Sequence, residues 1–265
     1  MIAACGDADR TVEIPFRVQV GGEPLACGTT YTGLGTSRST WEPLEAKLFV
    51  HAPRLVRADG TEVEIALEQD DRWQRDAFAL LDFDDSQGRC APADIATNTA
   101  LRGTVPDGDY TGLRFEIGLP PESNHLDAAT APAPLNQPGM WWSWRGGYKF
   151  MRFDGVTRGN PAYYLHLGAS GCEGSVAAGF ACTAGNVPVV DLASFDVDAD
   201  AVQLDLAQVW EGVDLDRQID FQTDFVQGCM SSAADPECPT VLAALGLGLD
   251  GVPTGSPPAF VVGAP

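Results

Sequence analysis

Tryptophan and histidine are the residues of this sequence whose positions most suggest chemistry. Trp141, Trp142 and Trp144 lie close together in the segment MWWSWRGGYKF. The chain contains three histidines, and two of them, His125 and His166, flank this cluster. Imidazole nitrogen is a good ligand for copper, zinc, iron and nickel, and a buried indole N–H needs a hydrogen-bond partner. The pattern therefore indicates an aromatic cluster beside a metal site.

The third histidine, His51, follows an apolar run far from the other two. His166 lies in YYLHLG, where a strand would place it on the same face as Tyr164. These separations are too long for a local pair of ligands, so each histidine taken alone also fits a structural role. The tryptophans likewise fit a core layer of a sheet, and spacing does not decide between the two interpretations.

Two other chemistries receive less support from the sequence. The segment GASG at 168–171 does not have the order of a GxSxG nucleophile elbow, so no motif promotes a hydrolase. Asp196, Asp198 and Asp200 alternate as calcium ligands do, but the glycine and the final glutamate of an EF-hand loop are missing.

The acidity of the chain restricts its partners. The 265 residues carry a formal net charge of −21, and 45% of them are hydrophobic, which is enough for a substantial core. A surface this acidic repels phosphate backbones and anionic lipid head groups, so we expect no nucleic-acid partner and no direct membrane adhesion. The charge fits a solvated surface, or one that attracts cations or a basic protein.

The seven cysteines predict an exported protein. Cys5 follows Ile-Ala-Ala and precedes glycine, as at the end of a bacterial lipoprotein signal, so we expect Cys5 to be lipid-modified or unpaired. The other six form an even set, which predicts three disulfides. Six cysteines can pair in many ways, and the economical choice joins the two local pairs and leaves the remaining two together: Cys172 with Cys182, Cys229 with Cys238, and Cys27 with Cys90. No CxxC spacing indicates a structural zinc site.

Hydrophobic residues mostly recur with a period of two, which is typical of strands half-buried in a sheet. The alternation is clear in FRVQV, TEVEIAL, GLRFEIGLP and VQLDL, while KLFVHAPRLV predicts a more apolar strand ended by Pro53. Turn signals at 21–22, 59–60, 106–108 and 154–155 separate these runs. Many short strands without alternating helices predict an all-β fold, an antiparallel β-sandwich with long loops and short helices.

The chain shows no internal repeat, so we expect a single domain over residues 16–250. Residues 1–15 are interpreted as a lipoprotein-like linker and 251–265, rich in proline and glycine, as a flexible tail. Short helices are predicted over 207–213 and 239–247. The long loop 120–138 holds His125 and leads into the tryptophan cluster, and structured loops of this length are more often functional than structural.

Several phrases in combination resemble the MbnP-like family, also called the metallo-mystery pair four-Cys proteins. They are CGTTYTGLG, KLFVHAPRLV, WQRDAFALLDFDD, GTVPDGDYTGLRFEIGLP, MWWSWRGGYKF, HLGASGC and GCMSS, together with NH at 124–125 and PLN at 134–136. The resemblance extends from about residue 16 to about residue 248. Where family members often carry a polar residue after the position of His51, this chain has Ala52-Pro53.

The resemblance implies a copper-binding protein of the periplasm or cell surface that is not itself an enzyme. Its implied partner is a di-haem protein of the MbnH/MauG type, which converts one tryptophan to kynurenine. An indole nitrogen has no usable lone pair, whereas kynurenine carries an aromatic amine that can join histidine nitrogens at copper. Carried over to this chain, the metal ligands would be His125, His166 and, less firmly, His51. The modified residue would be Trp144 or Trp142.

Two competing interpretations remain at this point. One is a surface carbohydrate- or protein-binding lipoprotein that holds no metal and uses exposed tryptophan for stacking. The other is a hydrolase with a histidine-based site. Copper binding distinguishes the family-based interpretation from both.

Overall fold

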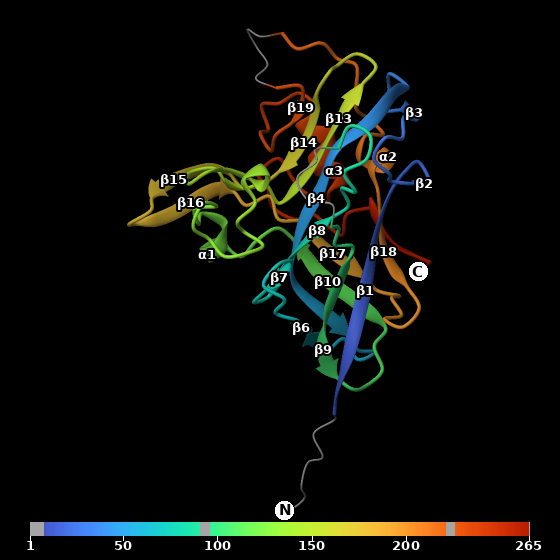
Figure 1. The fold of residues 1–265 in the computed structure, drawn as a ribbon, viewed down its shortest axis with the longest axis vertical. Coiled ribbons are helices and arrows are strands. Elements are labelled where there is room, and N and C mark those ends of the chain that lie inside the picture. The colour runs from blue at the N-terminus through green and yellow to red at the C-terminus, as the bar shows by residue number, and fades with distance from the viewer. Residues whose placement is uncertain (1–7, 91–95, 221–225, 265) are drawn as a thin grey trace, which may run out of the picture.

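Two β-sheets packed face to face build most of the molecule (Figure 1). The structure is a computed structural model, and it describes residues 8–90, 96–220 and 226–264. The predicted lipidation site, Cys5, lies outside these residues. None of the helices in the described ranges is long and apolar enough to cross a membrane. The predicted all-β sandwich is confirmed.

The first sheet has six strands, and its central strand is the long β1. Along this sheet the order is β20 (Phe260–Gly263), β18 (Ala201–Asp205), β1 (Asp9–Val20), β9 (Ala100–Pro106) and β6 (Ala66–Leu67), with β2 (Glu23–Pro24) paired to β1. β1 pairs antiparallel with β9 along its first half and parallel with β18 along its second half. The parallel pair departs from the purely antiparallel arrangement that the sequence predicted.

The second sheet has ten strands organised around β4, the longest strand. Its main path is β17 (Val189–Leu192), β10 (Gly112–Ile117), β4 (Ser39–Val56), β13 (Met151–Thr157), β14 (Tyr163–Leu167) and β19 (Gly228–Cys229). β3 (Tyr31–Leu34), β5 (Glu62–Glu64) and β8 (Phe78–Asp82) also pair with β4, and β7 (Gln74–Arg75) pairs with β8.

The alternating residues meet between the two sheets, as the period of two predicts. On β1, Phe16, Val18 and Val20 are buried, while Arg17 is exposed. The Phe16 ring packs edge-on against Phe115 of β10, with ring centroids 5.4 Å apart. This contact joins the two sheets directly, and burying such side chains is the main source of stability.

Two local expectations about turns are wrong. The strand predicted to end at Pro53 continues to Val56. Ala52 adopts φ 49°, a local irregularity that the strand accommodates. Pro53 has no N–H to donate, but its carbonyl still accepts from Ile65 N. The expected turn at 154–155 lies inside β13 instead. Gly155 is needed there for packing rather than for turning, because a Cβ would lie 1.9 Å from Nε1 of Trp41.

The predicted domain boundaries also move outward. β1 begins at Asp9, within the stretch assigned to a linker, and β20 lies within the stretch assigned to a flexible tail. β20 pairs antiparallel with β18, so the tail completes a sheet. The predicted helices are present as α2 (Leu206–Val209) and α3 (Cys238–Ala244).

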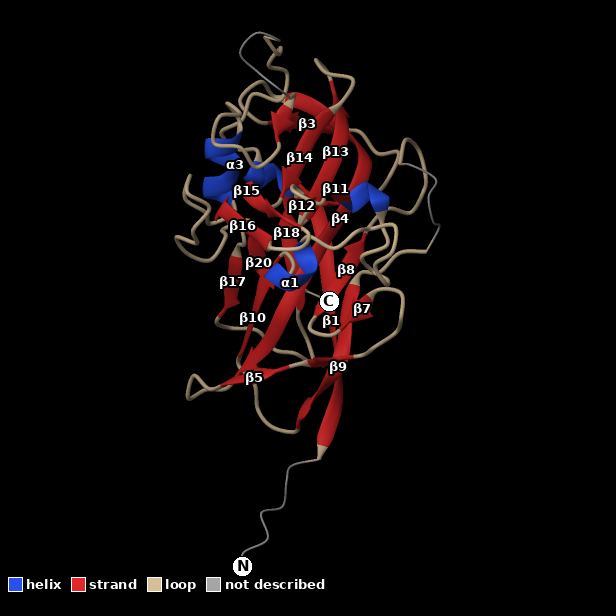
Figure 2. Ribbon diagram, turned by 90° about the vertical axis from the view of Figure 1, so that its left-hand side faces the viewer, coloured by secondary structure: helices blue, strands red, loops and turns tan. Residues whose placement is uncertain are grey.

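An arm projects from the side of the sandwich (Figures 1 and 2). It contains α1 (Pro121–Asn124), the hairpin of β15 (Ser170–Ser175) and β16 (Gly179–Ala184), and the adjoining pair β11 (Trp141–Ser143) and β12 (Gly147–Tyr148). A 3-10 turn, η1 (Pro138–Met140), leads into β11. The long loop predicted to be functional thus lies against the second sheet.

All three predicted disulfides are present. Cys172–Cys182 crosses the arm hairpin, and Cys229–Cys238 joins β19 to the start of α3. Cys27–Cys90 closes the largest loop, with a sequence separation of 63.

Candidate functional site

Tyr148 anchors the tryptophan segment to the outer face of the second sheet. Its ring lies edge-on to Phe49 of β4, and its hydroxyl donates to Leu135 O at 2.7 Å. Its backbone N–H donates to Oδ1 of Asn124 at 2.9 Å, which holds α1 beside β12. Both the tyrosine and the amide are buried, so this part of the loop is a fixed layer over the sheet.

Trp142 lies beside His166 at the end of β14. Their ring centroids are 6.1 Å apart, and the rings are tilted by 55°. The indole also packs directly over Gly168, where a Cβ would come within 2.6 Å of the ring. Glycine at this position therefore creates the space that the tryptophan occupies.

His166 is buried, and only one of its nitrogens has a partner. Nε2 lies 2.7 Å from Oδ1 of Asp154 on the neighbouring strand β13, whereas Nδ1 is buried and has no hydrogen bond to any residue that the structure describes. The Nε1 atom of Trp142 is likewise buried and unpartnered. Burial lowers the pKa of His166, against the opposing effect of its hydrogen bond to Asp154, so the neutral imidazole is favoured.

Lys149 gives this site an unusual cation. Its Nζ lies 5.8 Å from the centre of the Trp142 ring and donates to Gly139 O at 2.7 Å. Burial, with a further contribution from Arg152, lowers its pKa to about 8. A partly deprotonated amine at mildly alkaline pH follows from this position.

His125 occupies a different part of the arm. Its Nδ1 lies 2.7 Å from Trp144 O, and its ring stacks on Phe180 of β16 with centroids 4.6 Å apart. Its Nε2 lies 3.6 Å from Sγ of Cys182. That sulfur and Sγ of Cys172 are joined in a disulfide, so the three residues offer one imidazole and no thiolate.

The other two predicted site residues, Trp144 and His51, lie apart from the contact between Trp142 and His166. Trp144 is 50% exposed, and its ring lies edge-on to Trp141 at 6.1 Å. His51 lies on β4 with Nε2 3.1 Å from Oε2 of Glu116, and this hydrogen bond lowers the pKa of Glu116. The structure therefore brings Trp142 to His166, places His125 beside Trp144, and sets His51 against β10.

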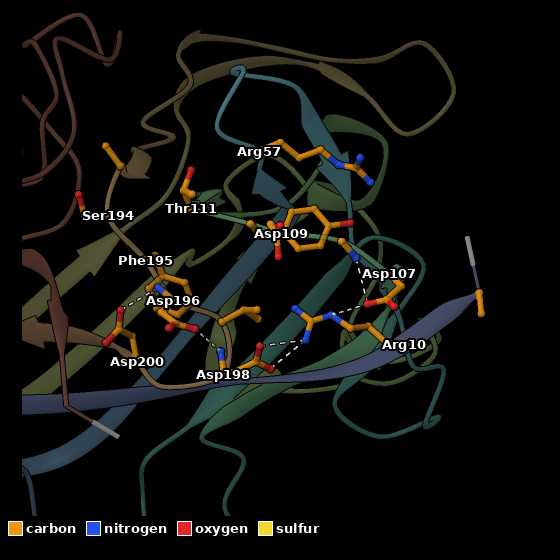
Figure 3. Close-up of a pocket in the computed structure, with 15 residues that line it drawn as sticks. Arg10, Arg57, Asp107, Asp109, Thr111, Ser194, Phe195, Asp196, Asp198 and Asp200 are labelled. Carbon is orange, nitrogen blue, oxygen red and sulfur yellow. Dashed lines mark hydrogen bonds and ion pairs between the residues drawn. The ribbon is translucent and has the colours of Figure 1, made fainter. Parts of the chain in front are cut away.

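The aspartates that alternate at 196–200 lie in an open pocket near the start of β1 (Figure 3). Asp196 Oδ1 accepts from Asp198 N, and Asp200 Oδ2 accepts from Asp196 N, which are the hydrogen bonds of a tight turn. Asp198 also binds Arg10 at 2.9 Å. Turn formation and ion pairing thus account for this acidic cluster.

Sequence reasoning missed Asp154, Lys149 and Gly168. Asp154 was interpreted as part of a turn because aspartate followed by glycine usually marks one. Its alternation with Arg152 in MRFDG is the signal that could have placed both charges on one strand face. Gly168 follows His166 in HLGASG, but nothing in that string shows which side chain it accommodates.

Comparison with known proteins identifies the family. The MbnP family profile matches residues 9–231. The solved structure of MbnP from Methylosinus trichosporium is 33% identical, with a TM-score of 0.86, and the match covers 97% of this chain and 99% of that one. No curated protein matches the chain. The chain belongs to the MbnP family.

Proposed function

We propose that this protein binds copper beside β14, using His166 and a kynurenine formed from Trp142. The protein is then the substrate of a di-haem enzyme of the MbnH/MauG type and not an enzyme itself. The observation that supports this choice is the contact of Trp142 with His166, in which Nε1 and Nδ1 are both buried without a hydrogen-bond partner among the described residues. A buried pair of unsatisfied nitrogens is costly unless something uses it.

The chemistry of the two side chains fits copper. A neutral imidazole is among the preferred ligands of copper, and His166 is kept neutral by its burial. Indole nitrogen offers no lone pair. Oxidative cleavage of the C2–C3 bond by the di-haem enzyme and its oxidant, followed by hydrolysis that releases C2 as formate, would leave that nitrogen as the aromatic amine of kynurenine. The residue that becomes a donor would therefore lie beside a histidine whose Nδ1 is already free.

Trp142 is favoured over Trp144 for this role. The ring of Trp144 points toward Trp141 and solvent, and its carbonyl is occupied by His125. His125 is not placed at this site, because its Nδ1 lies 2.7 Å from Trp144 O and its Nε2 lies 3.3 Å from Nδ2 of Asn124. His51 shows the same pattern as His166, with Nε2 on a carboxylate and Nδ1 buried without a hydrogen bond to a described residue. It is not included because of its position, since it faces Glu116 of β10 whereas His166 lies beside Trp142.

We further propose that the protein works in the periplasm or at the cell surface. Three disulfides support an oxidising compartment. Attachment to a membrane would then come from lipid on Cys5.

The test is copper titration of the purified protein before and after treatment with the cognate di-haem enzyme and an oxidant. Tandem mass spectrometry of the tryptophan peptide should show kynurenine at 142, and copper affinity should rise on conversion. Trp142→Phe should abolish both changes, while the matched variant Trp144→Phe should keep them. His166→Ala should weaken copper binding at least about tenfold, and the control His51→Ala should not. Conversion at 144, or no conversion by a demonstrably active enzyme, would contradict the assignment.

A second function is favoured by the exposure of Trp144. An exposed indole beside Trp141 could stack on a sugar ring or on a partner protein without any metal. Glycan binding that is lost in Trp144→Ala, together with copper binding no stronger than in His166→Ala, would support this alternative.

A further inference from the structure

We infer that Asp154 is a positioning residue that fixes the tautomer of His166, so that Nε2 carries the proton and Nδ1 keeps its lone pair. The use of that lone pair for copper rests on the proposed function. The tautomer itself is a property of the metal-free protein and can be tested without copper.

The hydrogen bond between His166 and Asp154 is short and shielded from solvent. Nε2 of His166 lies 2.7 Å from Oδ1 of Asp154, and the side chains are only 6% and 2% exposed. A carboxylate can only accept, so Nε2 must donate. In the neutral imidazole this leaves the proton off Nδ1, the nitrogen that has no partner.

The alternative is an imidazolium with protons on both nitrogens. It would leave a charged N–H buried at Nδ1 with no acceptor, which is more costly than an unused lone pair. Burial is the largest effect on the pKa of His166 and lowers it, although the hydrogen bond and charge of Asp154 act in the opposite direction. Lys149 and Arg152 add smaller effects in the same direction as burial. The neutral tautomer with Nε2–H is therefore the one that the surroundings select.

Arg152 fixes which oxygen of Asp154 faces His166. Its Nε donates to Oδ2 of Asp154 at 2.7 Å, so one carboxylate oxygen faces the guanidinium and the other faces His166. Strand register explains the arrangement, because Arg152 is the cross-strand neighbour of His166. The carboxylate therefore has a hydrogen-bonding partner on each side.

The charges continue across the sheet behind this pair. Arg152 Nη1 lies 3.4 Å from Oε1 of Glu45, and Lys47 Nζ lies 3.1 Å from Oε2 of the same glutamate. Lys47 also lies 3.3 Å from Asp82 and 3.3 Å from Asp84. These side chains form a charged row that crosses β14, β13, β4 and β8. Its members, in order, are His166, Asp154, Arg152, Glu45, Lys47, Asp82 and Asp84. Buried ion pairs contribute little net stability, but removing one partner leaves a charge uncompensated, so the row holds its members in a single arrangement.

The substitution Asp154→Asn tests the inference because Arg152 dictates how the amide must turn. The guanidinium is a donor only, so the amide oxygen must face Arg152 and the amide NH2 must face His166. Nε2 would then accept, and the proton would move to Nδ1. The experiment is nitrogen-15 NMR of histidine-labelled, metal-free protein at neutral pH, with His166 assigned by its loss in His166→Gln.

We expect the Nε2–H tautomer in the unsubstituted protein and the Nδ1–H tautomer in Asp154→Asn. The matched control Asp82→Asn removes a buried carboxylate at the far end of the row and should leave His166 unchanged. After conversion by the partner enzyme, Asp154→Asn should lower the affinity for copper(II) by about 10–100-fold.

The outcomes separate this inference from the proposed function. An Nδ1–H or doubly protonated His166 in the unsubstituted protein overturns the role of Asp154, even if copper binds. If the tautomer of His166 reverses in Asp154→Asn as expected, the positioning role of Asp154 is supported. If the copper affinity is at the same time unchanged in His166→Ala, the proposed copper site is refuted. If Asp154→Asn does not fold, the tautomer of the unsubstituted protein still decides.

Discussion

Trp41 and Trp142 each pack on a glycine, Gly155 of β13 and Gly168 directly after β14, yet their surroundings differ in kind. Trp41 is fully buried over Gly155 and packs against Trp210, with ring centroids 5.0 Å apart. Trp142 is half-buried over Gly168. Its neighbours are the ionisable side chains of His166 and Lys149.

The comparison shows how the surroundings of a core tryptophan differ from those of the tryptophan proposed to be modified. Nε1 is buried and unpartnered in Trp41, in Trp210 and in Trp142, so an unsatisfied indole N–H does not separate them. The difference lies in the neighbour. Only Trp142 of these three has its ring beside an imidazole with an unpartnered nitrogen, and this makes the pair a candidate ligand set.

The largest expected effect is on stability. Trp41→Ala should lower the free energy of unfolding by about 3–5 kcal/mol, because it leaves a cavity within a closed aromatic cluster. Trp142→Ala should cost about 1–2 kcal/mol, because solvent can fill part of the space. Urea denaturation of both variants measures the difference. Equal losses of unfolding free energy would show that Trp142 contributes to packing as much as Trp41 does.

Substitutions at the two glycines should separate an effect on stability from an effect on conversion of Trp142 by the partner enzyme. Gly155→Ala forces a methyl group against Trp41 and should cost about 1–3 kcal/mol or more. Gly168→Ala should displace Trp142, since the new Cβ would lie 2.6 Å from its ring and 2.7 Å from Tyr148 O. We expect Gly168→Ala, and not Gly155→Ala, to reduce conversion by the partner enzyme, as measured by mass spectrometry. Unimpaired conversion in Gly168→Ala would contradict the assigned position of Trp142.

Lys149 should make the stability of this region depend on pH. Its pKa falls from 10.5 to about 8 in the folded protein, so between these values the unfolded chain binds a proton that the folded chain has lost. The free energy of unfolding should therefore rise from pH 8 to pH 10.5, by on the order of 1–3 kcal/mol. Lys149→Met should remove this rise in denaturation curves measured across that range. A variant with the same pH profile as the unsubstituted protein would assign the dependence to other groups.

The smallest effect is expected at the exposed tryptophan. Trp144→Phe should change the free energy of unfolding by less than about 0.5 kcal/mol, because half of its surface is already in water. It should also leave the tautomer of His166 unchanged. A loss above about 1 kcal/mol would show that Trp144 contributes to packing as Trp41 does.

The sequence predicted the sandwich well because its signal is local. Alternation in FRVQV is a property of adjacent residues, and the same residues are buried in the structure. The disulfide pairs were also predictable, because two of them close short loops and leave one choice.

The site was only partly predictable because its contacts join distant strands. The pairing of Asp154 with His166 depends on the register of β13 and β14, which sets Arg152 opposite His166 and Asp154 opposite Tyr164. The contact of His125 with Trp144 O, and the fit of Trp142 over Gly168, depend on how the arm folds. No single stretch of sequence encodes these contacts.

The position of β1 has a consequence for how the protein is made. Its second half, from Phe16 to Gln19, hydrogen-bonds in parallel with β18, whose first paired residue is Val202. At a synthesis rate of 5–20 residues per second, roughly 10–40 seconds separate the emergence of the two strands. During that interval the strand edge is unpaired and can recruit other chains. Such long-range pairing slows folding, so the nascent chain needs protection from aggregation until about three quarters of the 265 residues have been made.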